Sequence, residues 1–385
     1  MGNISFLLGA GFSVNQGYPT AYRLAQAITS LQYGDFIVSA AGNVGATPDG
    51  KDIWTLGSYK LAKECVLELI KLFEEREPGN FNYEEFYDFL ALTEETDFSD
   101  AELAILRKYI SKDAWYKDLL NLRSDLIKIF TQIVSWKISD GGEDKFYSSN
   151  VVTDFSKNKY AGFLELVRHF KSEGKLFNFH TLNHDLFLES LRYTDEFGGE
   201  MSDGFTDDTE FYEDSDGYEK KLSKFTDKYP SNIRLFKLHG SFEIIAFRGN
   251  GRVTDYIKFP WRTDLTNIKK RKSQGDILDF TNYHSDFLSG TMFKKSRYSE
   301  PLYFGVMLDH FGKNLEQCDK LIIIGYGCLD SGINEIIEEK LRAGIPIYVV
   351  DPYPSNDVKE FVNKKGAILI VKTPENITLK DFDEK

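Results

Sequence analysis

Two polar segments contain side chains that could orient a water molecule and accept its proton. Segment 181–185 includes Asn183 and Asp185, and segment 237–241 includes His239. An asparagine amide both donates and accepts hydrogen bonds, and a histidine followed by glycine can act as a general base near neutral pH. Ordinary alternatives stay open, because Asn and Asp also cap helices and a lone histidine is more often a satisfied core residue.

Glycine-containing turns follow two apolar runs. Gly9-Ala10-Gly11-Phe12-Ser13 follows the run 4–8, and Gly325-Tyr326-Gly327 follows the run 321–324. Backbone N–H groups at such a strand–turn–helix junction can bind a pyrophosphate, although many tight turns use glycine for geometry alone. Asp330 and Asp351 come after two of the runs, where acids bind ribose hydroxyls or an adenine amino group, or cap the next helix.

The elements that must position these residues form a repeating pattern. Short apolar runs, typical of strands buried on both faces, lie at 4–8, 176–179, 235–238, 321–324, 347–350 and 368–371. Helical patterns at 21–31 and 334–341 separate some of them. The order predicts an α/β fold with a doubly wound, Rossmann-like parallel sheet, in which five strand ends bring their polar residues to one crevice.

Residues 58–138 predict an all-helical insertion between the first strand and the rest of the sheet. Apolar residues recur at helical spacing from Leu61 to Phe73, and Pro78-Gly79 ends that helix. Ser99 and Glu102 form a capping-box pattern, and a long apolar stripe runs through 115–138.

Two further insertions are expected within a single catalytic domain spanning 1–385. Residues 195–232 begin with eleven acids and no Lys or Arg over 195–219, which favours a solvated, irregular acidic loop. Residues 248–300 form a loop-rich basic stretch around Lys269-Lys270-Arg271-Lys272, more typical of a solvated turn than of a nucleic-acid surface.

Composition excludes several classes of protein. Sixty acids against 47 bases give a net charge of −13 over 385 residues, so direct binding to a nucleic-acid backbone is not expected. The three cysteines form no C-x-x-C pair, which excludes a disulfide framework and a four-cysteine zinc site. No apolar stretch approaches the ~20 residues of a membrane helix and no leader pattern is visible, so we expect a cytoplasmic protein without membrane contact.

Four segments, taken in order, resemble the sirtuin-like family. They are 9–13 together with Gly17-Tyr18-Pro19-Thr20, then Thr181-Leu182-Asn183-His184-Asp185, then Lys237-Leu238-His239-Gly240-Ser241, then Gly325-Tyr326-Gly327. The chain looks most like the bacterial sirtuin-like proteins of anti-phage defence, and it is similar in size to those paired with a HerA-type hexameric ATPase.

The resemblance implies roles for individual residues. Asn183 matches the asparagine that positions the ribose and the attacking water, with Asp185 beside it, and His239 matches the histidine base. Gly9, Ala10, Gly11 and Ser13 match the loop that holds the NAD pyrophosphate, whereas 325–327 and Asp351 fall where the family holds the adenosine half. The predicted cofactor-binding residues are Gly9, Ala10, Gly11, Phe12, Ser13, Thr20, Gly325, Tyr326, Gly327, Asp330 and Asp351.

Departures from the family's protein deacylases point to a different reaction. The chain has no zinc module with two C-x-x-C pairs, and Pro19-Thr20-Ala21-Tyr22 does not reproduce the Asp-Phe-Arg that follows the matching proline. We therefore expect NAD as a substrate, hydrolysed to nicotinamide and ADP-ribose without zinc, in a homo-oligomer gated by assembly or by a HerA-type ATPase. A non-catalytic NAD or ADP-ribose sensor is the alternative, followed by a deacylase.

Overall fold

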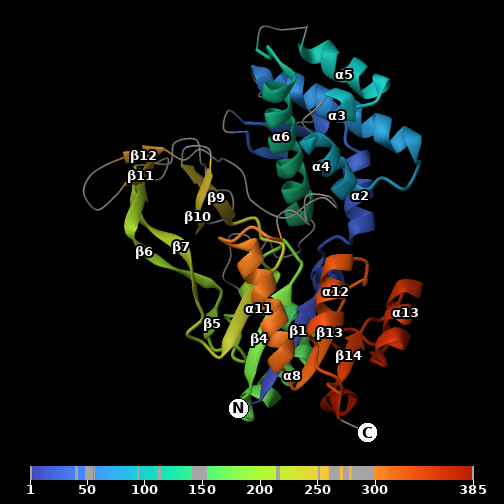
Figure 1. Cartoon of the computed structure of the whole chain (residues 1–385), viewed down its shortest axis with the longest axis vertical. Helices are drawn as coiled ribbons and strands as arrows, with labels where there is room; N and C mark the ends of the chain where they lie inside the picture. Colours follow the sequence, from blue (N-terminus) through green and yellow to red (C-terminus); the bar gives the residue numbers. More distant parts are fainter. Residues whose placement is uncertain are drawn as a thin grey trace.

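Seven parallel strands form the central sheet in the part of the chain that the computed structural model describes (Figure 1). The described residues are 2–39, 42–47, 55, 57–92, 95–110, 115–140, 154–213, 217–249, 252–259, 269–271, 277–279 and 298–383. The strand order is β15-β14-β13-β1-β4-β8-β5. The bounds are β1 Asn3–Leu8, β4 Leu176–Thr181, β5 Met201–Ser202, β8 Ile233–Lys237, β13 Lys320–Ile324, β14 Ile347–Val350 and β15 Ile368–Ile370. The six predicted strands and the α/β fold class are confirmed.

The sheet reverses its winding between β1 and β13. From β1 the chain continues to β4 on one side, whereas from β13 it continues to β14 and β15 on the other. At such a switch point the loops after the two neighbouring strands leave in opposite directions and open a crevice at their carboxyl ends. The loop after β1 and the loop after β13 therefore define where a ligand site is expected.

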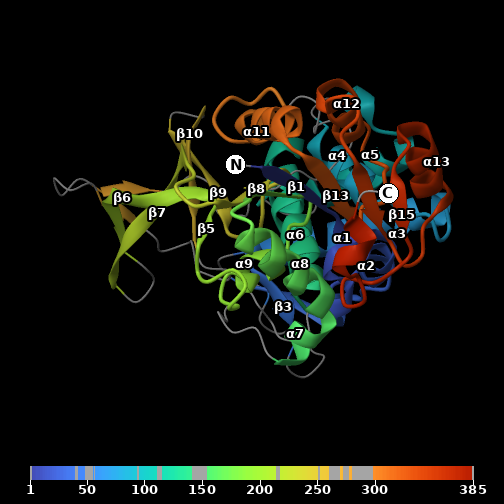
Figure 2. The same cartoon turned by 90° about the horizontal axis from the view of Figure 1, so that it is seen from below.

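Alternating side chains of β1 build two separate cores, one on each face of the sheet. Phe6 packs with Phe163 of α8 (Ala161–Ser172), whereas Leu7 belongs to the core formed with α11 (Phe304–Gln317), α12 (Ser331–Lys340) and α13 (Asn356–Lys365). Figure 2 shows α11, α12 and α13 on one face and α8 on the other. Both faces are covered, which explains why the strands are mainly apolar.

The helices of the predicted 58–138 block lie over the carboxyl ends of the strands (Figure 1). They are α3 Ser58–Arg76, α4 Tyr83–Ala91, α5 Asp100–Ile110 and α6 Leu119–Asp140. The predicted capping box is confirmed: the Ser99 N–H donates to Glu102 Oε2 at 2.6 Å, and the Glu102 N–H donates to Ser99 Oγ at 3.4 Å.

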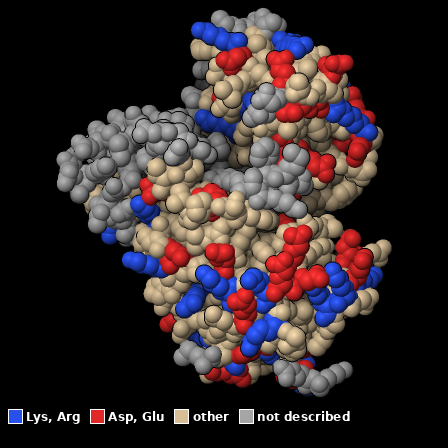
Figure 3. Space-filling view, in the orientation of Figure 1, with Lys and Arg blue, Asp and Glu red and all other residues tan. Residues whose placement is uncertain are grey.

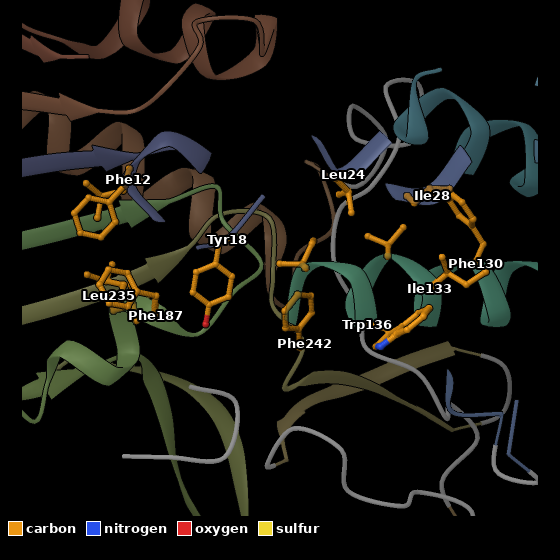
Figure 4. Close-up of a cluster of buried hydrophobic side chains, with 14 of the residues drawn as sticks. Phe12, Tyr18, Leu24, Ile28, Phe130, Ile133, Trp136, Phe187, Leu235 and Phe242 are labelled. Carbon is orange, nitrogen blue, oxygen red and sulfur yellow. The ribbon is translucent and has the colours of Figure 1, made fainter. Parts of the chain in front are cut away.

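Apolar contacts join this block to the sheet. In Figure 4, Leu24 and Ile28 of α2 (Ala21–Thr29) face Phe130 and Ile133 of α6, and the cluster continues to Phe12 near the sheet. The helical block and the sheet therefore share one continuous core.

The remaining short elements are α1 Ala10–Ser13, α7 Asp154–Lys159, α9 Phe187–Leu191, β2 Phe36–Val38, β3 Val44–Ala46 and 3-10 turns at Val14–Gln16, Tyr33–Asp35, Glu95–Asp97 and Leu379–Phe382.

The expectation of an irregular acidic loop at 195–232 is wrong. Strands β6 (Gly204–Glu213) and β7 (Glu219–Lys228) pair in an antiparallel ladder within a six-stranded sheet of order β12-β11-β6-β7-β10-β9. The other members are β9 Ile244–Gly249, β10 Arg252–Lys258, β11 Lys269–Arg271 and β12 Ile277–Asp279. In this ladder Lys224, Lys221 and Lys220 of β7 lie opposite Thr206, Phe211 and Tyr212 of β6, and Glu219 lies opposite Glu213. The 248–300 segment contributes the end of β9 and all of β10, β11 and β12 to this sheet, and its other residues mostly lie outside the described residues.

Acidic and basic side chains alternate over the visible outer surface. Figure 3 shows Lys and Arg interspersed with Asp and Glu over the face that carries α11, α12 and α13. No helix in the described portion of the chain is both long enough and apolar enough to cross a membrane.

Candidate functional site

A cleft of about 1300 Å³ opens at the switch point of the sheet. Loops after β1, β4, β8, β13 and β14 line it, and the helical block closes part of it. The predicted site residues in its lining are Gly9, Ala10, Gly11, Thr20, Asn183, Asp185, His239, Gly325, Tyr326, Gly327, Asp330 and Asp351. The predicted convergence of five strand ends is therefore confirmed, whereas the roles of the individual residues stay predictions.

Glycines allow the loop after β1 and the loop after β13 to touch. A Cβ added to Gly9 would lie 2.6 Å from the Gly325 carbonyl oxygen, and one added to Gly11 would lie 2.7 Å from the Gly325 Cα. Gly325 itself has a φ of +63°, and its Cβ would lie 2.3 Å from the Phe12 nitrogen. Only glycine fits these positions without moving the backbone, so the glycine pattern builds the floor of the cleft.

Several N–H groups of the first loop are already used inside the protein. The Gly9 N–H donates to the Ile324 carbonyl at 3.0 Å, the Gly11 N–H to the Gly325 carbonyl at 2.9 Å, and the Phe12 N–H to the Gly9 carbonyl at 2.9 Å. The first two donors attach the loop to the end of β13, and the third closes a turn within the loop. A pyrophosphate would therefore have to be held by other groups than these three.

Two of the predicted ligand-binding residues do not line the cleft. The Phe12 ring is buried between Tyr160, Phe163 and Phe187, and Ser13 is 1% exposed. The side chains of Phe12 and Ser13 are therefore not placed to contact a ligand in the cleft. Phe12 packs the loop against the core, and Ser13 supports the side chains that do face the cleft.

Asn183 is held with its amide nitrogen toward the protein. Its Nδ2 donates to the Gly9 carbonyl at 2.9 Å and to Ser13 Oγ at 3.1 Å, and its backbone N–H donates to Thr181 Oγ1. None of the described residues donates to its Oδ1, and the residue lines the cleft at 9% exposure. The fixed amide therefore offers a hydrogen-bond acceptor to whatever enters.

Asp185 lies behind Asn183 in a buried network of charges. Its Oδ1 accepts from the Phe187 N–H at 3.0 Å, and the Ser13 hydroxyl is a second partner. Burial raises the pKa of Asp185, although the neighbouring Lys237 ammonium opposes the shift. Lys237 donates to the Asp185 carbonyl and pairs with Glu189 at 3.1 Å. Asp185 follows β4, and its contact with Lys237 attaches it to the end of β8 as well.

His239 faces Asp330 across the cleft. Its Nε2 lies 3.4 Å from Asp330 Oδ2, with the two side chains 6% and 13% exposed. Asp330 also caps α12 by accepting the Ile333 N–H at 3.1 Å. This confirms the alternative that this acid caps the next helix. The structure therefore places Asp330 beside the predicted base, whereas sequence analysis grouped it with the cofactor-binding residues.

The remaining predicted residues occupy the rim and one wall of the cleft. Thr20 caps α2 by accepting the Arg23 N–H at 3.3 Å, and Asp351 accepts the Tyr353 N–H at 2.8 Å. The Tyr326 hydroxyl lies 3.1 Å from both the Asp330 carbonyl and Asn334 Oδ1. These contacts shape the wall and give each polar side chain a structural task.

The other histidines divide into core and cleft residues. His180 is fully buried, with Nδ1 bonded to the Phe6 carbonyl at 2.9 Å and Nε2 to Asn314 at 3.0 Å, and burial lowers its pKa to about 3. It is a satisfied core histidine. His184 lines the cleft, with its ring 6.3 Å from that of His239.

Sequence reasoning missed the part of the cleft that does not come from strand ends. Tyr298 lines it and donates to the Asp330 carboxylate, and Tyr22, Glu74 and residues 79–84 line it from the helical side. No spacing relates these residues to the strand-end segments. Of the described residues in the lining, none is Lys or Arg.

No group of three or more His, Cys, Asp or Glu that could hold a metal ion occurs within the described ranges. The three cysteines are buried and free.

The fold and the cleft define an α/β protein with a doubly wound parallel sheet and a ligand-sized opening at its switch point. No protein-family model matches the chain, and no curated protein matches it. It is similar to solved structures of Sir2 homologues. A Sir2 homolog–NAD complex has 10% identity and a TM-score of 0.38, with 97% of this chain and 85% of that chain covered.

Two further structures are similar at the same level. An ADP-ribose complex of a mutant Sir2 homologue has 10% identity and a TM-score of 0.38, covering 97% of this chain and 87% of that one. A third structure, which concerns the mechanism and regulation of Sir2 enzymes, has 12% identity and a TM-score of 0.35. The match covers 98% of this chain and 90% of that one. Structural similarity at this level does not assign an activity to this chain.

Proposed function

We propose that this protein hydrolyses NAD⁺ at the bond between nicotinamide and ribose, releasing nicotinamide and ADP-ribose. The observation that carries the proposal is the pairing of Asn183 and His239 in one cleft, next to the glycine-built floor. One side chain offers a fixed acceptor and the other a base, which is the combination that directing and deprotonating a water molecule requires.

The proposed reaction needs no acid for the leaving group. The nicotinamide nitrogen of NAD⁺ is already cationic, so the breaking C–N bond leaves its electron pair on that nitrogen and nicotinamide departs neutral. Water forms the new bond to the ribose carbon, and its proton passes to His239. Asn183 Oδ1 accepts a hydrogen bond from the water or a ribose hydroxyl and fixes its direction.

The charge of the cleft supports a cationic transition state. Cleavage develops positive charge on the ribose, as in glycoside hydrolysis. Carboxylates of Asp185 and Asp330 line the cleft, and the described lining contributes no Lys or Arg. Acidic residues without a neighbouring Lys or Arg in the described lining give the cleft a negative potential, which favours a cationic transition state.

The test incubates the purified chain with NAD⁺ in ¹⁸O-labelled water without any acylated peptide, and measures nicotinamide and ADP-ribose by chromatography and mass spectrometry. Hydrolysis predicts equal amounts of both products and one ¹⁸O atom in ADP-ribose. The matched control is His184→Gln, a second cleft histidine without an assigned role, which should retain most of the activity. NAD⁺ binding without nicotinamide release in every assembly state would support the sensor, and release only with an acylated peptide would support the deacylase.

We further propose that assembly or a partner gates this activity. Unrestricted hydrolysis would exhaust the NAD⁺ of a cell, and the helical block that closes the cleft could transmit docking to the site. A homo-oligomer, a HerA-type ATPase as partner and a role in anti-phage defence belong to this proposal. If every assembly state of the chain, with and without the ATPase, hydrolyses NAD⁺ at one rate, gating is refuted.

A further inference from the structure

The Asp330 carboxylate is held in place by three different elements. Its Oδ1 accepts the Ile333 N–H of α12 at 3.1 Å, and the Tyr298 hydroxyl lies 3.3 Å from Oδ1 and 3.4 Å from Oδ2. His239 Nε2 lies 3.4 Å from Oδ2. The carboxylate is therefore oriented before any ligand enters, so it loses little free energy to reorganisation.

The backbone at Asp330 is fixed as well. The Asn334 amide donates to the Cys328 carbonyl at 2.7 Å, and the Tyr326 hydroxyl lies 3.1 Å from the Asp330 carbonyl. Cys328 adopts a φ of +59°, a conformation that L residues rarely take, so these bonds hold a turn that is costly by itself. The turn sends the Asp330 side chain back toward the end of β8.

The two residues come from distant strands. β8 and β13 are separated by β4 and β1 in the sheet, yet the loops that follow them meet above the intervening strands. An N-cap function alone requires the contact with Ile333 and no contact with His239. The additional approach to an imidazole that lines the cleft needs a different explanation.

We propose that Asp330 is the positioning residue of His239, an inference that rests on the proposed NAD⁺ hydrolysis. Its carboxylate orients the imidazole ring and stabilises the positive charge that the ring acquires when it takes the proton of water. A negative charge within about 4–6 Å favours the protonated form of an imidazole, and the carboxylate lies within that distance. Asp330 then acts through His239 and contacts neither water nor ribose.

Several titratable or charged groups surround this part of the cleft, and the test must separate Asp330 from them. They are His184 and Asp185 after β4, Lys237 at the end of β8 with its partner Glu189, Tyr326 after β13, and Tyr298 before α11. A substitution confined to Asp330 leaves all of them in place.

The decisive variant is Asp330→Asn, which keeps the size and the helix cap because Asn caps as well as Asp. Turnover of NAD⁺ should fall about 10- to 100-fold, a part of the ~10²–10⁴-fold that a positioned base contributes. NAD⁺ affinity should stay within about twofold. The acid limb of the pH–rate profile should move to lower pH, since the neutral amide no longer favours the protonated ring.

A matched control removes a cap elsewhere. Ser355 caps α13 by accepting the Val358 N–H at 3.3 Å, and Ser355→Ala should retain full turnover. Full turnover of Asp330→Asn with an unmoved acid limb would overturn the inference. So would a loss of turnover that Ser355→Ala reproduces, because the loss would then not be specific to Asp330.

A second readout does not depend on turnover. The side-chain ¹⁵N signals of the six histidines can be followed by NMR against pH, with His239→Gln identifying the relevant signal. Asp330→Asn should lower the midpoint of His239 alone. If the parent releases no nicotinamide, the proposed function fails, and this midpoint still decides the pair: a shift supports coupling of Asp330 to His239, and an unmoved midpoint refutes it.

Discussion

His180 should make the folded protein sensitive to mild acid. The ring is fully buried in β4 and hydrogen-bonded at both nitrogens, and burial lowers its pKa from its ordinary value of 6.5 to about 3. Between these two pKa values the histidine is protonated in the unfolded chain and neutral in the folded chain. Stability contributed by the neutral ring is fully present above pH 6.5 and is lost as pH falls from there toward the folded pKa.

The magnitude follows from the separation of the two pKa values. At about pH 5.5 the unfolded histidine lies one pH unit below its own pKa, which corresponds to a loss of about 1.4 kcal/mol relative to about pH 7.5. Replacing the residue by Gln removes this term while keeping a donor and an acceptor. The difference in unfolding free energy between the two pH values should therefore be about 1.4 kcal/mol smaller in His180→Gln than in the parent.

Urea unfolding followed by tryptophan fluorescence at both pH values measures this difference. Groups that titrate alike in the parent and the variant cancel when the two pH dependences are subtracted. His169→Gln on α8, where the side chain is 39% exposed, controls for replacing a histidine outside the core. Equal pH dependence in the parent and His180→Gln would refute the reasoning.

Two further predictions concern the floor and the support of the cleft. Gly325→Ala should lower the free energy of unfolding by about 3 kcal/mol, because a Cβ would meet the Phe12 nitrogen at 2.3 Å. Gly366→Ala, with nearly the same φ of +61° but open space around it, should cost only about 1 kcal/mol, and equal losses in urea unfolding would contradict the packing argument. Ser13→Ala removes one of two anchors of the Asn183 amide and should cost about 1 kcal/mol, with nicotinamide release slowed several-fold. An unchanged release rate would show that Ser13 does not orient Asn183.

Elements whose signal is local could be predicted from the sequence. The apolar runs became strands because burial on both faces favours mainly apolar residues, and the Ser99–Glu102 pair capped its helix because that exchange of hydrogen bonds needs only residues three apart. The convergence of Asn183 and His239 also followed, since the carboxyl ends of parallel strands share one edge.

Contacts that depend on packing between loops could not be predicted. Asp330 meets His239 where the loops after β13 and β8 come together, a distance that no spacing encodes. The strands β6 and β7 were missed because the count of acids over 195–219 hid their pairing with the lysines that follow. The glycine pattern at 9–11 likewise concealed that two of its N–H groups bond to the neighbouring loop.

The most direct test of the central claim compares nicotinamide release from saturating NAD⁺ by the parent, Asn183→Ala and His239→Ala, without acylated peptide and with NAD⁺ binding measured on the same samples. We predict release by the parent and a loss of about 10²–10⁴-fold in each variant, with binding of NAD⁺ retained. Release that continues at the parental rate in either variant would contradict the assignment of that residue to the reaction.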